Sequence, residues 1–313
     1  MKYGYLGPEG TFTEAALEQL LAQRGESGTA ERYAAISVPD ALGRLERGEL
    51  DGVVVPIENS LEGGVPATLD ALTRHGELQI VAETLVTVAF VCAVRPGTAL
   101  EDVRAFGTHP HAEAQVRSFL RRRLPAAEYI PTASTAAAAK ALSEGTADYQ
   151  AAIGPALAAE RFGLDIAEAD IGDNADAVTR FILVQRPGSL PERTGADKTT
   201  IVAGLRSDRS GALLELLEQF ATRGITMSRL ESRPTGNGLG LYQFSIDLLG
   251  HVEEERVAEA LTGAYRICRE LRYLGSYPSA DGKITPVESL TTDTAFQAAR
   301  SWLDGILEHG RRD

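Results

Sequence analysis

Hydroxyl and amide side chains that could do chemistry gather in four short segments, each next to an expected strand or helix end. The first, GPEGTF (7–12), ends beside Thr11 at a helix start, where free N–H groups suit a carboxylate or a phosphate. The second, PIENSLEGGV (56–65), places Asn59 and Ser60 behind an apolar run, and an asparagine amide both donates and accepts hydrogen bonds. A plain turn with an N-cap explains the first segment equally well, whereas the second favours a functional loop.

The third segment opens a helix. In THPHAEAQ (108–115), Thr108 is the expected cap, and Gln115, about two turns further on, either reaches toward a cleft or simply packs. A metal site is not favoured, because the pair His109 and His111 has no convincing third ligand nearby.

The fourth segment, TRF (179–181), enters a strand. Alternation along a strand points Thr179 and Phe181 to one side and Arg180 to the other. These three residues carry no signal alone. Their weight comes from occurring together with the other three segments.

Alternating strands and helices must position these segments. Strands are expected near 3–6, 32–36 and 53–55, with helices from Thr11 to about Gly25 and from Ser37 to about Gly48 between them. This βαβαβ order predicts a doubly wound α/β unit, whose ligands bind at the carboxyl ends of its strands.

The pattern restarts after residue 78 with a long β-rich passage, which could carry the chain into a second lobe. The elements expected there are helices over 109–124, 133–144 and 155–162 and strands around 103–106 and 147–153. Residues 178–185 form a strand that could return to the first lobe. We therefore expect two α/β lobes with a cleft between them, which resembles the type II periplasmic-binding-protein fold.

A second domain follows a stretch of prolines and glycines at 186–197, which has the composition of a linker. The next elements are strand 198–205, helix 210–223, strands 225–232 and 239–248, helix 252–268 and a strand near 270–276. This βαββαβ order is ferredoxin-like. In the tail we expect an amphipathic helix, with Trp302 docking on the body or on a partner subunit. The expected domains are 1–187, 198–277 and the tail 278–313.

The composition of the chain argues against several classes of function. The chain has 313 residues, a net charge of −13 and 43% hydrophobic residues, which is typical of a globular protein and argues against nucleic acid or an anionic membrane as the main partner. Cys92 and Cys268 lie far apart in apolar patterns, so neither a disulfide nor a reactive thiolate is expected. The first residues hold no signal-peptide run, and we expect a cytoplasmic protein.

Together the segments resemble the prephenate dehydratase family over nearly the whole chain to about residue 277. The matching pieces are GPEGTFTEAA (7–16), PIENSLEGGV (56–65), THPHAEAQ (108–115) and TRF (179–181), and in its ACT-type regulatory domain GALLELLEQF (211–220) and ESRP (231–234). Each piece is weak by itself. Six pieces in the right order make the resemblance specific.

The resemblance implies an activity and a set of site residues. The activity is the decarboxylating dehydration of prephenate to phenylpyruvate, CO2 and water in phenylalanine synthesis, which requires no metal and no cofactor. Thr179 would assist the departure of the hydroxyl group. The implied substrate-binding residues are Thr11, Asn59, Ser60, Thr108, Gln115, Arg180 and Phe181.

The same resemblance implies feedback regulation. L-phenylalanine would bind between two ACT domains, so at least a homodimer is expected, or a tetramer. The implied effector residues are Gly211, Ala212, Leu213, Glu231, Ser232 and Arg233. Some positions depart from the family pattern: Thr108 stands where serine is usual, and Ser210 replaces a proline.

Two other functions remain open at this point. One is the dehydration of arogenate, the transaminated analogue of prephenate, which the residues do not separate from prephenate. The other is a non-catalytic sensor of small acids, because two-lobed folds also serve transport and regulation. Such a sensor would not need the hydroxyl donor of Thr179, and would more often carry a signal peptide or a DNA-binding segment.

Overall fold

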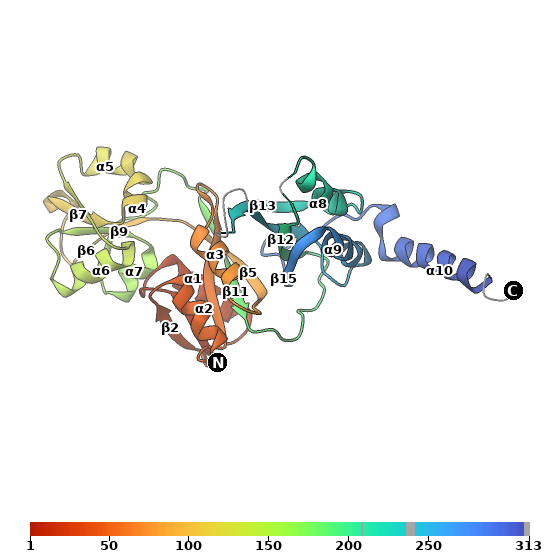
Figure 1. Cartoon of the computed structure of the whole chain (residues 1–313). Coiled ribbons are helices and arrows are strands. Elements are labelled where there is room, and N and C mark those ends of the chain that lie inside the picture. Colours follow the sequence, from red (N-terminus) through yellow and green to blue (C-terminus); the bar gives the residue numbers. More distant parts are fainter. Residues whose placement is uncertain (208, 236–241, 310–313) are drawn as a thin grey trace. The chain divides into compact units, whose positions relative to one another are not determined.

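A computed structural model describes residues 1–207, 209–235 and 242–309 of the chain (Figure 1). The chain divides into two compact units. Unit 1 comprises Met1–His75 and Thr84–Val184, and unit 2 comprises Gly76–Glu83 and Gln185–Asp313. The short segment Gly76–Glu83 is thus grouped with residues that follow it by more than a hundred positions.

The first lobe of unit 1 is built on a sheet with the strand order β2-β1-β3-β11-β5, and β4 pairs with β3. Its elements are β1 (Lys2–Leu6), α1 (Phe12–Gln23), β2 (Glu31–Ala35), α2 (Val38–Glu46), β3 (Gly52–Asn59), β4 (Gly63–Gly64), α3 (Pro66–Arg74), β5 (Gln79–Thr87) and β11 (Val178–Gln185). Strand β1 pairs in parallel with β2 and β3, whereas β11 returns antiparallel to β3. The apolar run Val53–Val55 is fully buried, as expected for a central strand.

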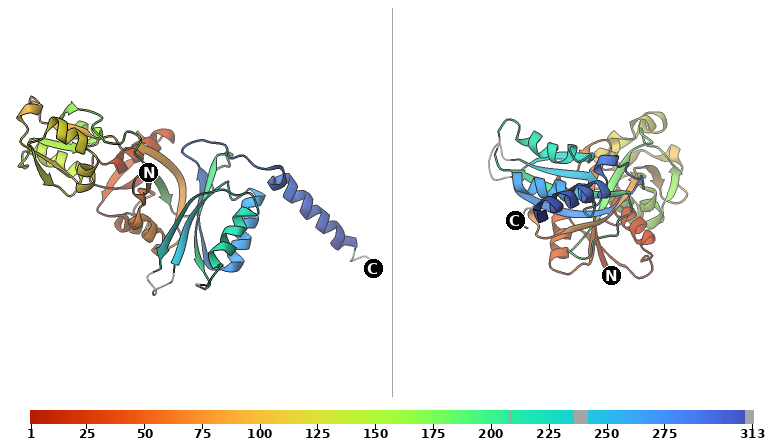
Figure 2. Two further views of the ribbon diagram at one scale, coloured as in Figure 1. Left: turned by 90° about the horizontal axis from the view of Figure 1, so that it is seen from above. Right: turned by 90° about the vertical axis from the view of Figure 1, so that its right-hand side faces the viewer.

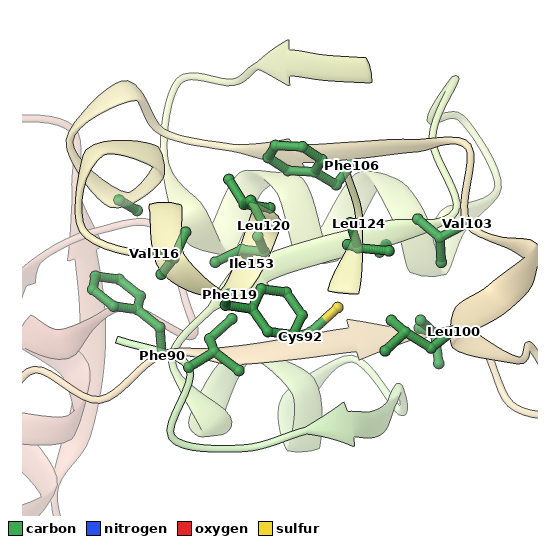
Figure 3. Packing of buried hydrophobic residues seen from close by; sticks show 14 of the residues in the cluster. Phe90, Cys92, Leu100, Val103, Phe106, Val116, Phe119, Leu120, Leu124 and Ile153 are labelled. Carbon is green, nitrogen blue, oxygen red and sulfur yellow. The ribbon is translucent and has the colours of Figure 1, made fainter. Parts of the chain in front are cut away.

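The second lobe has its own five-stranded sheet, in the order β10-β6-β9-β7-β8. Its elements are β6 (Val91–Val94), η1 (Leu100–Asp102), β7 (Ala105–Thr108), α4 (Pro110–Ala114), α5 (Arg117–Arg123), β8 (Glu128–Pro131), α6 (Thr135–Glu144), β9 (Ala151–Gly154), α7 (Ala156–Arg161) and β10 (Asp165–Glu168). Figure 3 shows its apolar core, in which Phe90 and Cys92 meet Phe119 and Ile153.

The second lobe corrects one expected helix. Residues 109–124 form two short helices, α4 and α5, instead of one. Between them Val116 leaves the helical conformation, with φ −129° and ψ 19°, and its side chain is fully buried. Packing of this valine into the core shown in Figure 3 therefore overrides the continuous helical pattern of the sequence.

Unit 2 contains the expected ferredoxin-like order, in an antiparallel sheet β13-β14-β12-β15. Its elements are β12 (Asp197–Leu205), α8 (Ala212–Ala221), β13 (Met227–Pro234), β14 (Tyr242–Leu249), α9 (Glu255–Ile267), β15 (Cys268–Pro278), η2 (Ser289–Thr291) and α10 (Asp293–His309). Figure 2 shows α8 and α9 side by side on one face of this sheet. Residues 239–241 of one expected strand lie outside the described residues.

The segment Gly76–Glu83 is tied to β12 and β15. The buried Glu83 carboxylate accepts hydrogen bonds from Lys198 Nζ at 2.8 Å and from the backbone N–H of Ala280 at 2.8 Å. Gly275 adopts φ +139°, and a Cβ at this position would lie 2.2 Å from the carbonyl oxygen of Ile80. Glycine is therefore required where this segment crosses β15.

The C-terminal helix α10 is fixed at its beginning by ion pairs. Asp293 accepts from Arg193 at 2.6 Å, and Arg300 donates to Glu255 at 2.9 Å. Further along, Trp302 is 70% exposed. The expectation that Trp302 docks on the body of the same chain is therefore wrong, because its side chain remains largely exposed. Docking on a partner subunit stays a prediction.

Candidate active site

The end of β3 and the beginning of β11 bring Asn59 and Thr179 together, although 120 positions separate them in the chain. The antiparallel register pairs these two residues directly, so their side chains share one face of the sheet. The amide Nδ2 of Asn59 donates to the hydroxyl oxygen of Thr179 at 2.8 Å. Thr179 is 8% exposed.

The orientation of the Asn59 amide follows from its other hydrogen bonds. Its Oδ1 accepts from the backbone N–H groups of Leu61 at 2.8 Å and Glu62 at 3.3 Å. Because Oδ1 faces donors, Nδ2 must face Thr179. The threonine oxygen thus receives a hydrogen bond, and its own O–H hydrogen is left to donate elsewhere. Among the described residues, Asn59 is the only side-chain partner of this hydroxyl.

Ser60 and Arg180 flank this pair. The Ser60 hydroxyl accepts from the backbone N–H of Val178 at 3.0 Å, so it fastens the loop after β3 to the start of β11. Arg180 is buried, and its guanidinium lies 3.4 Å from the carboxylate of Glu58. The register shifts between Arg180 and Phe181, and Phe181 packs in the core. The residue skipped by this shift is Ile57 of β3, so the alternation expected along β11 stays a prediction.

Thr108 does not cap a helix, and that expectation was wrong. It is the last residue of β7, it is fully buried, and its hydroxyl donates to the carbonyl oxygen of Ile153 at 2.7 Å. The cap of α4 is His109, whose Nδ1 accepts from the N–H of His111 at 3.3 Å. Burial and the neighbouring imidazole lower the pKa of His109, which keeps this ring neutral and able to accept. Gln115 ends α4 and is half-buried.

The loop at residues 7–12 already holds a carboxylate of the protein itself. Thr11 caps α1 as expected, accepting from the N–H of Glu14 at 3.4 Å. The buried Glu14 carboxylate accepts from the N–H of Gly10 and forms an ion pair with Arg161 of α7. An anion from outside would have to displace Glu14, so the Gly10 N–H is not a ready anion site.

Two contacts between the lobes of unit 1 involve residues of the segments described above. His111 Nδ1 lies 3.2 Å from Glu62 Oε1, and the rings of Phe12 and Phe90 pack edge to face with centroids 5.7 Å apart. Glu58 and Glu62 were not expected to be site residues. Both lie in the PIENSLEGGV segment that carries Asn59. Their closeness to Asn59 in the sequence is the signal that could have identified them as site residues.

Cys92 is a free cysteine buried in the core of the second lobe. Burial raises the pKa of the Cys92 thiol to about 12, so it stays protonated near neutral pH. Over residues 1–207, 209–235 and 242–309, no group of three His, Cys, Asp or Glu side chains is placed to hold a metal ion. Within the same ranges, no helix combines the length and the apolar character needed to cross a membrane.

Known proteins resemble this chain over most of its length. A prephenate dehydratase from Mycolicibacterium vanbaalenii is 45% identical over 315 residues, which cover 97% of each chain. The crystal structure of a prephenate dehydratase from Arthrobacter aurescens in complex with L-Phe is 53% identical, with a TM-score of 0.91 over 98% of this chain and 100% of that one. Another solved structure, described as a novel type of quorum quenching acylase, is 30% identical, with a TM-score of 0.79 over 89% of this chain and 98% of that one.

The family model of prephenate dehydratase matches residues 3–189, a range that includes Asn59 and Thr179. With this match and the identity of the relatives over almost their whole length, the chain belongs to the prephenate dehydratase family.

Proposed function

We propose that the chain catalyses the decarboxylating dehydration of prephenate to phenylpyruvate, and that Thr179 is its catalytic residue. The observation that carries the proposal is the hydrogen bond from Asn59 Nδ2 to the Thr179 oxygen at 2.8 Å. Accepting this bond leaves the threonine hydrogen free to donate, and it polarises the hydroxyl toward stronger donation.

The dehydration of prephenate requires such a hydrogen-bond donor. In prephenate the bond from the ring to its carboxylate breaks, and the electron pair moves into the ring. The bond from the opposite ring carbon to the hydroxyl breaks at the same time, which leaves CO2, hydroxide and an aromatic product. A threonine hydroxyl is too weak an acid to transfer its proton outright near neutral pH. As a positioned donor it stabilises the negative charge on the departing oxygen, which takes up a solvent proton to become water.

The other residues bind or position. Arg180, buried beside Glu58, is proposed to receive the pyruvyl carboxylate, since the Gly10 N–H is already occupied by Glu14. Asn59 and Ser60 hold the loop and the Thr179 hydroxyl in place. We propose that Gln115 contacts the substrate, and that Thr11, Thr108 and Phe181 support the site through the packing and hydrogen bonds described above.

The test is a rate measurement on the purified full chain. Phenylpyruvate formation is followed by its absorbance with prephenate, and phenylalanine formation is followed with arogenate. We expect turnover of prephenate that exceeds turnover of arogenate. If only arogenate is turned over, arogenate replaces prephenate as the proposed substrate. If neither compound is turned over, the enzyme assignment fails and a sensor of small acids becomes the better interpretation.

Acyl hydrolysis is less well supported by the same geometry. A threonine nucleophile needs an adjacent base, usually an imidazole, an amine or a carboxylate. In the part of the chain that the structure describes, the side-chain partner of the Thr179 hydroxyl is an amide, which is no base. An acylase assay on the same protein preparation is the appropriate control.

We propose an effector site for L-phenylalanine at the start of α8. A cavity of about 300 Å3 there is lined by Leu205, Arg206, Ser207, Arg209, Ala212, Glu215 and Ile267. Arg206 is held by the carbonyl oxygens of Cys268 and Arg266, both at 3.1 Å, and α8 begins without a side-chain cap. A carboxylate at this helix start would meet uncapped N–H groups and the Arg206 guanidinium, while Arg209 is paired with Glu215. The apolar lining would receive the aromatic ring.

The segment Glu231–Arg233 does not line this cavity within one chain. It lies on β13, at the edge of the four-stranded sheet. We propose that a second copy of the chain brings Glu231, Ser232 and Arg233 to the cavity, as Gly211, Ala212 and Leu213 contribute from the first copy. The active form would then be a homo-oligomer, a dimer or a tetramer, in the cytoplasm. The proposed domains are 1–187, 198–277 and 278–313.

Replacing Gly211 by valine should weaken inhibition by L-phenylalanine by at least ~10-fold, a change of about 1.4 kcal/mol in coupling. Gly211 adopts φ +86° with no atom within 4 Å of an added Cβ, so the cost of the substitution is backbone strain at the start of α8 and not a clash. The measurement is the initial rate at increasing phenylalanine concentration. Activity without phenylalanine should persist.

Gly282→Val is the matched control, because Gly282 also has positive φ, +62°, and open space around it. This variant should leave the inhibition curve unchanged. Equal inhibition of Gly211→Val and the wild type would remove the start of α8 from the effector site.

A further inference from the structure

A second cavity in unit 2, of about 340 Å3, is separate from the proposed effector cavity and shares no residue with it. Its lining residues are Glu77, Leu78, Gln79, Pro187, Arg272 and Tyr273. They come from three stretches of the chain: the segment 76–83, the beginning of the connection after β11, and β15. The volume falls in the range of sites for small organic molecules.

Gln79 gives the cavity an unsatisfied donor. Its side chain is only 6% exposed, and its Oε1 accepts from the backbone N–H of Gly188 at 3.1 Å. Its Nε2 is buried and has no hydrogen-bond partner among the described residues. Turning the amide over would set Nε2 against the Gly188 N–H, donor against donor, so the orientation is fixed. A buried donor without a hydrogen bond is unfavourable, and an acceptor atom of a ligand would remove this cost.

Charges of both signs line the same cavity. Arg272 donates from Nη2 to the carbonyl oxygen of Gly76 at 2.7 Å, which holds its guanidinium against the segment that carries Gln79. Glu77 is exposed, and over the described ranges its carboxylate has no ion-pair or hydrogen-bond partner. The cavity therefore offers a cation and an amide donor together with an anion.

The remaining lining is apolar and held in place. Leu78 is buried, and Pro187 and the Tyr273 ring complete the wall. The Tyr273 hydroxyl donates to Ser276 at 3.0 Å, so the ring has a defined position. The close passage of Ile80 over Gly275 fixes the distance between the segment 76–83 and β15. The walls are thus formed before any ligand arrives.

We propose that this cavity binds a free α-amino acid in its zwitterionic form. The carboxylate meets Arg272 and the Gln79 Nε2, the ammonium meets Glu77, and the side chain lies against Leu78, Pro187 and Tyr273. A plain carboxylate would be repelled by Glu77 and a plain amine by Arg272. A molecule with both charges on one carbon satisfies all three polar groups at once.

The experiment titrates the full chain with each proteinogenic L-amino acid and follows binding by calorimetry and by saturation-transfer NMR. We expect at least one amino acid to bind the wild type and to bind Gln79→Glu and Glu77→Gln at least ~10-fold more weakly. Gln79→Glu keeps the acceptor for Gly188 but replaces the donor with a negative oxygen. Arg209→Met, in the effector cavity, should leave this binding unchanged.

Two matched analogues test the zwitterion itself. The same compound without its ammonium group, and the same compound without its carboxylate, should each bind at least ~10-fold more weakly than the amino acid. Glu77→Gln changes only an exposed side chain, so this variant should fold. It therefore still tests the binding site if Gln79→Glu does not fold. The proposal is overturned if no amino acid binds the wild type. It is also overturned if binding is lost in Arg209→Met but kept in Glu77→Gln, or if either analogue binds as tightly as the intact amino acid.

Discussion

Thr179→Val is expected to lower kcat by ~10²-fold or more with little change in KM, which corresponds to about 2.7 kcal/mol of transition-state stabilisation. Valine keeps the shape of the side chain but removes the O–H that is proposed to donate to the leaving oxygen. Because this charge develops only in the transition state, the loss should appear in kcat. Steady-state kinetics with prephenate measure both constants.

Thr84→Val is the matched control for this experiment. Thr84 is a buried threonine of the same unit, and its hydroxyl donates to Gln19 at 2.9 Å. The substitution removes a buried hydrogen bond without touching the site, so kcat should remain near the wild-type value. A folded Thr179→Val protein with normal kcat would contradict the catalytic role.

A double-mutant cycle with Asn59 separates positioning from direct contact. If Asn59 acts by orienting the Thr179 hydroxyl, Asn59→Leu should reduce kcat in the wild type and much less in the Thr179→Val background. Equal effects in both backgrounds would mean that Asn59 acts independently of the threonine.

Strands with continuous apolar runs were predictable from the sequence. Val53–Val55 lies in β3, and the expected strand 178–185 coincides with β11 (Val178–Gln185). In unit 2, the order of strands and helices followed from their spacing. By contrast, β8 and β10 were not expected, because these four-residue edge strands contain charged residues and no apolar run.

The candidate site was predictable as a set of segments but not as a set of contacts. Sequence patterns placed Asn59 and Thr179 at strand ends, yet only the antiparallel pairing of β3 with β11 makes them partners. Likewise, no local pattern shows that Glu14 pairs with Arg161 or that Glu58 lies beside Arg180. These contacts depend on pairing and packing between residues distant in the chain, which local propensity does not encode.

Asp247→Ala is expected to reduce the free energy of unfolding of unit 2 by about 3–5 kcal/mol, because it leaves a buried cation without its anion. Asp247 is fully buried in β14, and its two carboxylate oxygens accept from Arg229 at 2.8 and 3.0 Å. Asp247 also accepts from the Thr200 hydroxyl at 2.8 Å, so the substitution disturbs three neighbouring strands. Urea unfolding of the full chain, followed by circular dichroism, gives the change.

Two further variants decide whether the loss comes from the uncompensated charge. Glu215→Ala breaks the exposed pair of Glu215 with Arg209, 2.7 Å apart, and should cost less than about 1 kcal/mol. The double substitution Arg229→Met with Asp247→Leu removes both charges and fills the space with apolar atoms, so it should cost less than Asp247→Ala alone. If the double variant is the less stable of the two, the hydrogen bonds of the pair, and not the stranded guanidinium, would hold β13 and β14 together.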